Sequence, residues 1–195
     1  MYESLLPESI VDMELPVPAK LDTSRANIEL MRNAFAAMNR KDLDACVALL
    51  TPDFSINLAG APSAMSGPRA WRRNAEMLFS AFPDIQLHVE DMFAVDDKVA
   101  VRVRLKGTHT GEFLGNQPTG NKIEYESNEL YRIVDGKFAA EWICSDMLTL
   151  MSQIGAIPAK HLLFMYLAGF RVWFAAGIGL AAGVLLMLLA RFILS

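Results

Sequence analysis

Apolar residues recur at every second position over much of the chain between residues 85 and 146, which is the period of a β-strand. In residues 98–111, Val99, Val101, Val103 and Leu105 alternate with charged residues. The last two segments are joined by Asp135-Gly136, a strong signal for a tight hairpin turn. The pattern therefore predicts four consecutive antiparallel strands, at residues 85–93, 98–111, 122–133 and 137–146.

Upstream of these strands the apolar spacing is three or four residues, which is typical of amphipathic helices. We expect a first helix from the N-caps Thr23 and Ser24, and a second, short helix over residues 41–52 that stops near Pro52. A strand follows at residues 54–60, and Pro68 then opens a helix that ends before Pro83. Helices first and an antiparallel sheet afterwards predict an α+β domain, in which the helices cover one face of a curved sheet and leave a cone with an open mouth.

A 19-residue run without charge, Val172–Ala190, lies between Arg171 and Arg191. At 1.5 Å per residue it spans about 28 Å, close to the thickness of the hydrocarbon core of a bilayer. The alternative, a buried core helix, is less typical of so long a stretch with no polar face. The chain thus divides into an extended arm at 1–22, a globular domain at 23–157, an interfacial helix at 158–171 and a transmembrane anchor at 172–195.

The flanks of this run predict how the chain is oriented and what it contacts. No basic segment or signal peptide opens the sequence, so we expect a single-pass protein held in the lipid bilayer by its C-terminal helix. Lys160, His161 and Arg171 precede the run, which favours a cytoplasmic globular domain. Small residues at spacing four predict close packing against an integral membrane partner or a second copy: Ala175, Gly179 and Gly183.

Composition narrows the classes of function. The chain has 18 Lys and Arg against 22 Asp and Glu, and no basic stretch that could neutralise several phosphates, which argues against nucleic acid as a partner. The two cysteines, Cys46 and Cys144, form no metal-ligand spacing; we expect both to be reduced core thiols, and the alternative is a single disulfide between them. No nucleotide-binding fingerprint is present, so we expect neither a metal nor a cofactor.

Several motifs together resemble the SnoaL-like polyketide (ester) cyclase family, whose fold is the cone of nuclear-transport-factor-2-like proteins. The resemblance covers about residues 25–157 and implies ring closure by an aldol-type condensation without a cofactor. It also implies an acidic base on the last strand, which falls on Ile143, and a histidine on the preceding strand, which falls on Glu129. The motifs are Phe82-Pro83-Asp84, residues 107–111, 115–124 and 131–137, Glu141-Trp142, Asp146 and residues 153–155.

Ile143 cannot transfer a proton, so any chemistry needs another residue. If position 143 faces the cone, strand alternation places Glu141, Tyr125, Ser127, Glu129 and Tyr131 on the same face. Glu129 beside aromatic residues is then a candidate base with a raised pKa; the favoured alternative is an acid at the mouth of the cone, solvated or paired with Arg104 or Arg132.

Other residues are candidates for the walls of a pocket. His109 lies in a glycine-flanked loop, where we expect it at the rim, and Asp146 is expected to cap the helix that starts at Met147. Phe54, Met65 and Trp71 are candidates for an apolar pocket lining, although Trp71 also fits a plain core position.

Two functions follow from these observations. The favoured hypothesis is a membrane-anchored accessory or small-molecule-binding subunit, within a membrane protein complex, that has lost the base of the family. The alternative is a cofactor-independent cyclase or isomerase that acts on a lipophilic polyketide-like or terpenoid-like substrate, with Glu129 as base. Dimerisation through the sheet is compatible with both.

Overall fold

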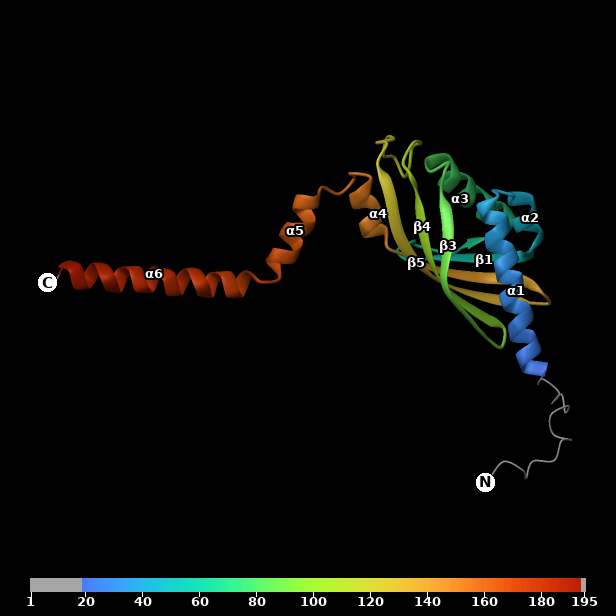
Figure 1. Cartoon of the computed structure of the whole chain (residues 1–195), viewed down its shortest axis with the longest axis horizontal. Helices are drawn as coiled ribbons and strands as arrows, with labels where there is room; N and C mark the ends of the chain where they lie inside the picture. The colour runs from blue at the N-terminus through green and yellow to red at the C-terminus, as the bar shows by residue number, and fades with distance from the viewer. Residues whose placement is uncertain (1–18, 194–195) are drawn as a thin grey trace, which may run out of the picture. The chain divides into compact units, whose positions relative to one another are not determined.

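A computed structural model describes residues 19–193, and its globular part is one open, curved six-stranded sheet with three helices on one side (Figure 1). The strand order is β2-β1-β6-β5-β4-β3, so β2 and β3 are the two edges. The strands are β1 Leu50–Leu58, β2 Met65–Ser66, β3 Gln86–Val95, β4 Lys98–Thr108, β5 Lys122–Val134 and β6 Lys137–Ser145. The helices are α1 Ala19–Asn39, α2 Leu43–Ala48, α3 Pro68–Ala81, α4 Met147–Gln153, α5 Ala159–Ala168 and α6 Arg171–Ile193.

The predicted α+β class and the antiparallel meander β3 to β6 are confirmed. Asp135 and Gly136 both have positive φ, 49° and 71°, as a tight two-residue hairpin between β5 and β6 requires. The sheet is antiparallel except where β1 runs parallel to β6, so that the first long strand pairs with the last. This pairing puts β6 in the interior of the sheet.

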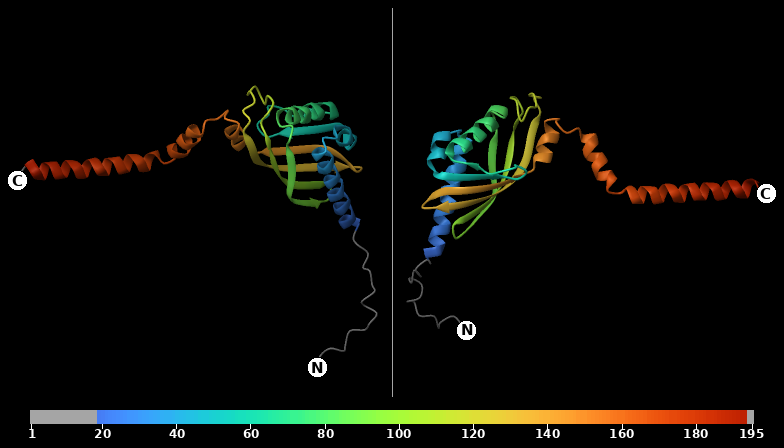
Figure 2. Two further views of the ribbon diagram at one scale, coloured as in Figure 1. Left: turned by 45° about the horizontal axis from the view of Figure 1, so that its top comes forward. Right: turned by 180° about the vertical axis from the view of Figure 1, so that it is seen from behind.

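The core lies between the sheet and the N-terminal helices. The two views of Figure 2 agree with Figure 1 that α1, α2 and α3 lie on one side of the curved sheet. Helix α1 packs on β3 and β4, and α3 packs on β1. The alternating apolar residues of β4 are buried on this side, as the period of two predicts: Val99, Val101, Val103 and Leu105. We call the covered side the inward face.

Two predicted boundaries are wrong. Helix α1 begins at Ala19, four residues before Thr23, because alanine, lysine and leucine are strong helix formers. The second helix ends at Ala48 and β1 begins at Leu50, so Pro52 lies in a strand. Proline cannot donate to a β-ladder, and Pro52 accordingly falls where the β1–β6 register breaks. The predicted arm at 1–18 lies outside the described residues.

Two motifs of the family resemblance contact each other and hold the loop after β4. The Asp84 carboxylate accepts hydrogen bonds from the backbone N–H and the hydroxyl of Thr108, both at 2.7 Å. The backbone N–H groups of Thr110 and Gly111 donate to the Ala81 carbonyl at the end of α3, at 3.1 and 3.0 Å. A Cβ on Gly111 would lie 2.1 Å from the Ser80 carbonyl oxygen, so only glycine fits there.

The C-terminal unit, residues 147–195, carries the predicted membrane span. Helix α6 has 23 residues and is long and apolar enough to cross a membrane. No residue of α6 is buried within this unit. Helix α5 also exposes large apolar side chains, including Phe164 and Met165.

Replacing Gly111 by alanine is expected to lower the free energy of unfolding of the globular part by about 1–3 kcal/mol, because the new methyl group overlaps the Ser80 carbonyl. Denaturant unfolding of the full chain in detergent, followed by tryptophan fluorescence, measures the change. The control is Thr110→Ala, which alters an exposed side chain one residue away and should leave stability within about 0.5 kcal/mol. Equal stability of the two variants would contradict this packing.

Candidate functional site

The candidate site lies on the inward face of β5 and β6. In the antiparallel register, Ser127 is opposite Ser145, Glu129 opposite Ile143, and Tyr131 opposite Glu141. Since side chains alternate along each strand, these residues share one face with the buried positions of β4. The structure therefore brings together the six side chains for which the alternation predicts a common face: Tyr125, Ser127, Glu129, Tyr131, Glu141 and Ile143.

Glu129 and Tyr131 form the accessible part of this row. The Tyr131 hydroxyl donates to Oε2 of Glu129 at 2.6 Å, and both side chains are half-buried. Burial raises the pKa of Glu129 above its usual range, while hydrogen bonds from Tyr131 and Ser127 oppose the shift. Burial also raises the pKa of Tyr131 well above 10, so its hydroxyl stays protonated and remains a donor. Glu129 is thus a carboxylate in a fixed position that solvent or a bound molecule can reach.

Glu141 is the more deeply buried acid of the pair, with 3% of its surface exposed. Its Oε1 is buried and has no hydrogen-bond partner among the residues that the structure describes. Burial, and then the negative charge of Glu129, raise the pKa of Glu141 well above its usual range. Because Glu129 has a hydrogen-bond donor and partial exposure, whereas Glu141 is buried, the pKa of Glu141 is raised further than that of Glu129.

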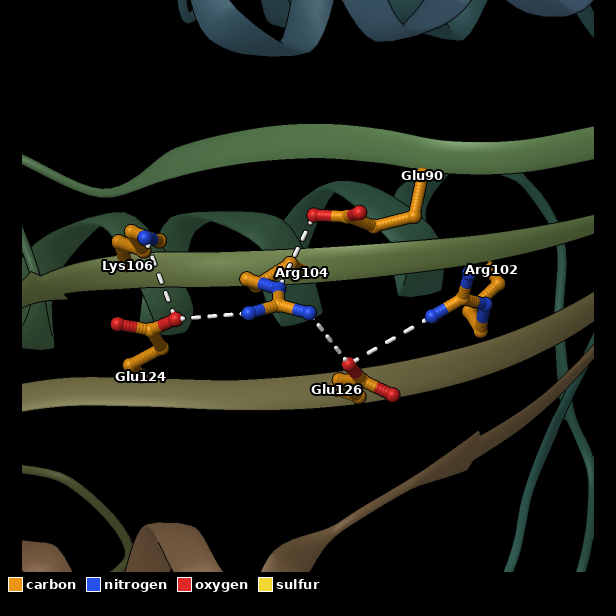
Figure 3. Close-up of polar contacts among 6 residues, drawn as sticks. All are labelled: Glu90, Arg102, Arg104, Lys106, Glu124 and Glu126. Carbon is orange, nitrogen blue, oxygen red and sulfur yellow. Dashed lines mark hydrogen bonds and ion pairs between the residues drawn. The ribbon is translucent and has the colours of Figure 1, made fainter.

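No cation balances these two acids within the strands. None of the inward register positions of β1 and β3 to β6 is lysine or arginine. The proposed pairing of Glu129 with Arg104 is wrong, because Arg104 lies on the opposite face. It is held there by Glu90, Glu124 and Glu126 at 3.0, 3.1 and 2.9 Å, as Figure 3 shows. Arg132 occupies the same outward parity of β5.

The other predicted site residues are less accessible than expected. His109 is not at a rim: it is fully buried, stacks on Phe82 at 5.4 Å between ring centroids, and places Nδ1 3.1 Å from the Thr119 hydroxyl. The expectation failed because the loop folds back onto the end of α3. Phe54 is also fully buried and is a core residue, not a pocket wall.

Two of the remaining candidates are half-buried, and two lie deep. Met65 on the edge strand β2 and Trp71 on α3 keep partial exposure, as a pocket wall requires. Tyr125 and Ser127 are buried at the base of the row, where Ser127 and Ser145 hydroxyls lie 2.9 Å apart. Burial, followed by the charge of Glu129, raises the pKa of Tyr125 well above its usual range.

A groove of about 640 Å³, which the sequence patterns do not predict, is lined mainly by outward-facing residues and also by the candidate site residues Glu129 and Ile143. Phe93, Leu130 and Trp142 line it, and Phe93 is 61% exposed. A β-bulge between Val89 and Asp91 turns Phe93 outward, and no sequence pattern announces that bulge. Cys144 also lines the groove and is an exposed free thiol, so its placement in the core is wrong; Cys46 is buried, with a pKa raised to about 11 by burial.

The acids present do not form a metal site. Over residues 19–193, no group of three histidine, cysteine, aspartate or glutamate side chains is arranged to hold a metal ion. The inward face itself carries a half-buried carboxyl group, a phenol that donates a hydrogen bond to it, and a second, buried carboxyl group on the neighbouring strand.

Comparison with known proteins identifies the family. Residues 28–154 match the SnoaL-like polyketide cyclases, and the chain belongs to this family. The match ends before α5 and α6, so the apolar C-terminal helix lies outside it. No curated protein sequence matches significantly.

Solved structures with similar folds include proteins described with different activities. AclR from Streptomyces galilaeus, a candidate hydroxylase, is 34% identical over 67% of this chain and 96% of its own, with a TM-score of 0.61. A candidate SnoaL-like polyketide cyclase from Jannaschia sp. CCS1 is 26% identical over 69% and 95%, with a TM-score of 0.64. IdmH from Streptomyces antibioticus, a candidate polyketide cyclase, is 30% identical over 65% and 96%, with a TM-score of 0.57. The fold therefore leaves the reaction to be argued from the site.

Replacing Glu141 by glutamine is expected to stabilise the protein at neutral and alkaline pH. Glu141 binds its proton more tightly in the folded state, so the stability of the native protein falls as pH rises from the unfolded pKa near 4.5 towards the raised folded pKa. Glutamine cannot ionise, so the variant lacks this loss, which is at most about 1.4 kcal/mol per pH unit.

Thermal unfolding of the full chain between about pH 5 and pH 8 measures the effect as a growing difference between the two proteins. Asp53→Asn, which neutralises an exposed acid, is the control and should follow the wild type. A Glu141→Gln curve parallel to the wild-type curve would show that Glu141 is an ordinary ionised acid.

Proposed function

We propose that this protein is a membrane-anchored, cofactor-independent enzyme of the cyclase or isomerase kind, with Glu129 as its base. The observation that carries the proposal is Glu129 itself: a half-buried carboxylate on the inward face, with a raised pKa and a 2.6 Å hydrogen bond from Tyr131. A carboxylate whose pKa is raised towards neutrality is a stronger base than a solvated one and still ionises at working pH.

The reaction best suited to this group is removal of a proton from the carbon next to a carbonyl. Glu129 would take the proton, the electron pair of the C–H bond would form an enolate, and the enolate carbon would attack a second carbonyl carbon or regain a proton elsewhere. The first outcome closes a ring and the second isomerises the substrate. Membership of the SnoaL-like polyketide cyclase family supports this class of reaction.

The surroundings favour a lipophilic substrate. Ile143 stands opposite Glu129, Leu58 stands beside Ile143 on β1, and both are half-buried apolar residues. In this proposal Ile143 is a wall of the substrate site, and the base has moved to the neighbouring strand. An apolar anchor such as α6 would keep the domain next to a bilayer, where such substrates collect.

A second candidate function is an accessory or small-molecule-binding subunit of a membrane complex, with its globular domain in the cytoplasm. It is favoured by Ile143 at the position where the family resemblance calls for an acid, and by α6, which has no buried residue. Ala175, Gly179 and Gly183 would then face an integral membrane partner or a second copy. This candidate requires no turnover, so an activity assay separates it from the first.

Glu129→Gln is expected to lower the rate of proton exchange by about 10²-fold or more, because glutamine cannot accept the proton. The assay uses the full chain in phosphatidylcholine vesicles and follows deuterium uptake from heavy water next to the carbonyl of a long-chain methyl ketone, by NMR. Glu126→Gln is a matched control, since it removes the same charge from the outward face of the same strand. Exchange that no variant alters, or that never exceeds the rate in empty vesicles, would favour the accessory subunit.

Replacing both Leu180 and Val184 in α6 by arginine is expected to release the chain from membranes. Each arginine near the centre of a span costs about 3 kcal/mol of insertion free energy. Alkaline extraction of membranes should leave the wild type and a double alanine control in the pellet and move the arginine variant out of it. Retention of the arginine variant would contradict a role for α6 as an anchor.

A further inference from the structure

We infer that Glu141 is a second catalytic residue: it donates a proton to the carbonyl oxygen of the substrate while Glu129 removes a proton from the adjacent carbon. The inference rests on the proposed function, and it assigns the acid half of the reaction. The resemblance to the family points to positions 143 and 129, and it gives position 141 no chemical role.

The geometry places Glu141 beside the base and leaves it without a competing partner. Glu141 on β6 is the register partner of Tyr131 on β5, and the Tyr131 hydroxyl is bonded to Glu129. The three side chains therefore form one row on the inward face, with Tyr131 next to both acids. The Glu141 Oε1 is wholly buried and has no hydrogen-bond partner among the described residues, and 3% of the residue is exposed.

A buried carboxyl group without a hydrogen bond is costly for the folded protein. No lysine or arginine occupies an inward strand position, so the strands offer no cation to pair with an ionised Glu141. A substrate carbonyl that accepts a hydrogen bond from the protonated Glu141 carboxyl group would give that group a partner. A neutral acid held in an apolar site is also a better donor to a developing enolate oxygen than water is.

The proton transfers balance within the pair. Glu129 receives the proton from carbon, the C–H electron pair becomes part of the new carbon–carbon double bond, and the carbonyl oxygen takes the proton of Glu141. The enol carbon then attacks a second carbonyl carbon, whose oxygen takes the proton from Glu129. The enol O–H returns its proton to Glu141, so the pair again holds one proton and one negative charge, and no oxidant or reductant is needed.

The same arrangement selects substrates by charge. A site with one permanent negative charge and no cation at its inward strand positions repels carboxylate and phosphate groups. The substrate class is therefore an uncharged carbonyl compound. A ketone or an ester fits, whereas a free acid or a phosphate-bearing thioester does not.

The pair also predicts a bell-shaped dependence of the rate on pH. The ionisable groups that act on Glu141 are Glu129 and Tyr131, and its neighbour Ile56 on β1 has no charge. Protonation of Glu129 removes the base at low pH, and ionisation of Glu141 removes the donor at high pH. Substitution of Glu129 should therefore alter the acid limb of the pH profile, and substitution of Glu141 should alter the alkaline limb.

The test measures deuterium exchange of the long-chain methyl ketone, and of the same ketone with a terminal carboxylate, by the full chain in phosphatidylcholine vesicles across pH. Glu141→Gln is expected to lower exchange by about 10²-fold and to abolish the alkaline limb, while Glu141→Asp restores part of the rate. The carboxylate-bearing ketone should exchange at least about tenfold more slowly than the neutral one. Glu124→Gln, on the outward face of β5, is the control and should change neither rate nor profile.

The outcomes separate the two proposals. Loss of exchange in Glu129→Gln together with a full rate and an unchanged bell in Glu141→Gln would overturn the role of Glu141 and leave the base in place. Absence of exchange above empty vesicles with the wild type would overturn both. Thermal unfolding of each variant shows that a lost rate does not come from a lost fold.

Discussion

The repulsion between two like-charged carboxyl groups on one face of the sheet is the constraint on which this site depends. Glu129 and Glu141 lie on adjacent strands, and the strands supply no lysine or arginine to offset them. Glu129 receives a hydrogen bond from Tyr131, whereas Glu141 is buried, and its burial and the charge of Glu129 raise its pKa well above the usual range. The lysine and arginine side chains of the long strands lie on the outward face, where Arg104 contacts three glutamates. A lysine or arginine on the inward face would pair with one of the two acids and would change the difference between their pKa values.

The two acids differ in burial although both lie on interior strands of the sheet. Glu141 on β6 is 3% exposed, whereas Glu129 on β5, opposite Ile143, is half-buried. Residues that lie far from the site hold the frame: Asp84 fixes Thr108, and Gly111 lets the following loop lie against α3. The contacts of these motifs explain why they occur together in the sequence although none of them reaches the two acids.

Much of the fold could be predicted from the sequence because alternation is a local signal. The alternation along β4 and β5 and the Asp135-Gly136 dipeptide each predict the local structure from a few consecutive residues. The shared face of Glu129, Glu141 and Ile143 followed from the same alternation. Three features that local patterns do not encode were not predicted: the parallel pairing of β1 with β6, the bulge that turns Phe93 outward, and the folding of the His109 loop into the core. These depend on contacts between distant segments. The uncharged 19-residue run, by contrast, is again a local property, and it lies within the 23-residue helix α6, which is long and apolar enough to cross a membrane.

The infrared spectrum of the full chain at neutral pH distinguishes a neutral Glu141 beside an ionised Glu129 from a pair of ionised acids. A protonated carboxylic acid has a carbonyl stretching band that a carboxylate lacks. We expect the wild type to show this band at neutral pH, Glu141→Gln to remove it, and Glu129→Gln to keep it, because burial alone still favours the neutral form of Glu141. A wild-type spectrum without the band, or a band that persists in Glu141→Gln, would show that Glu141 is not the neutral acid.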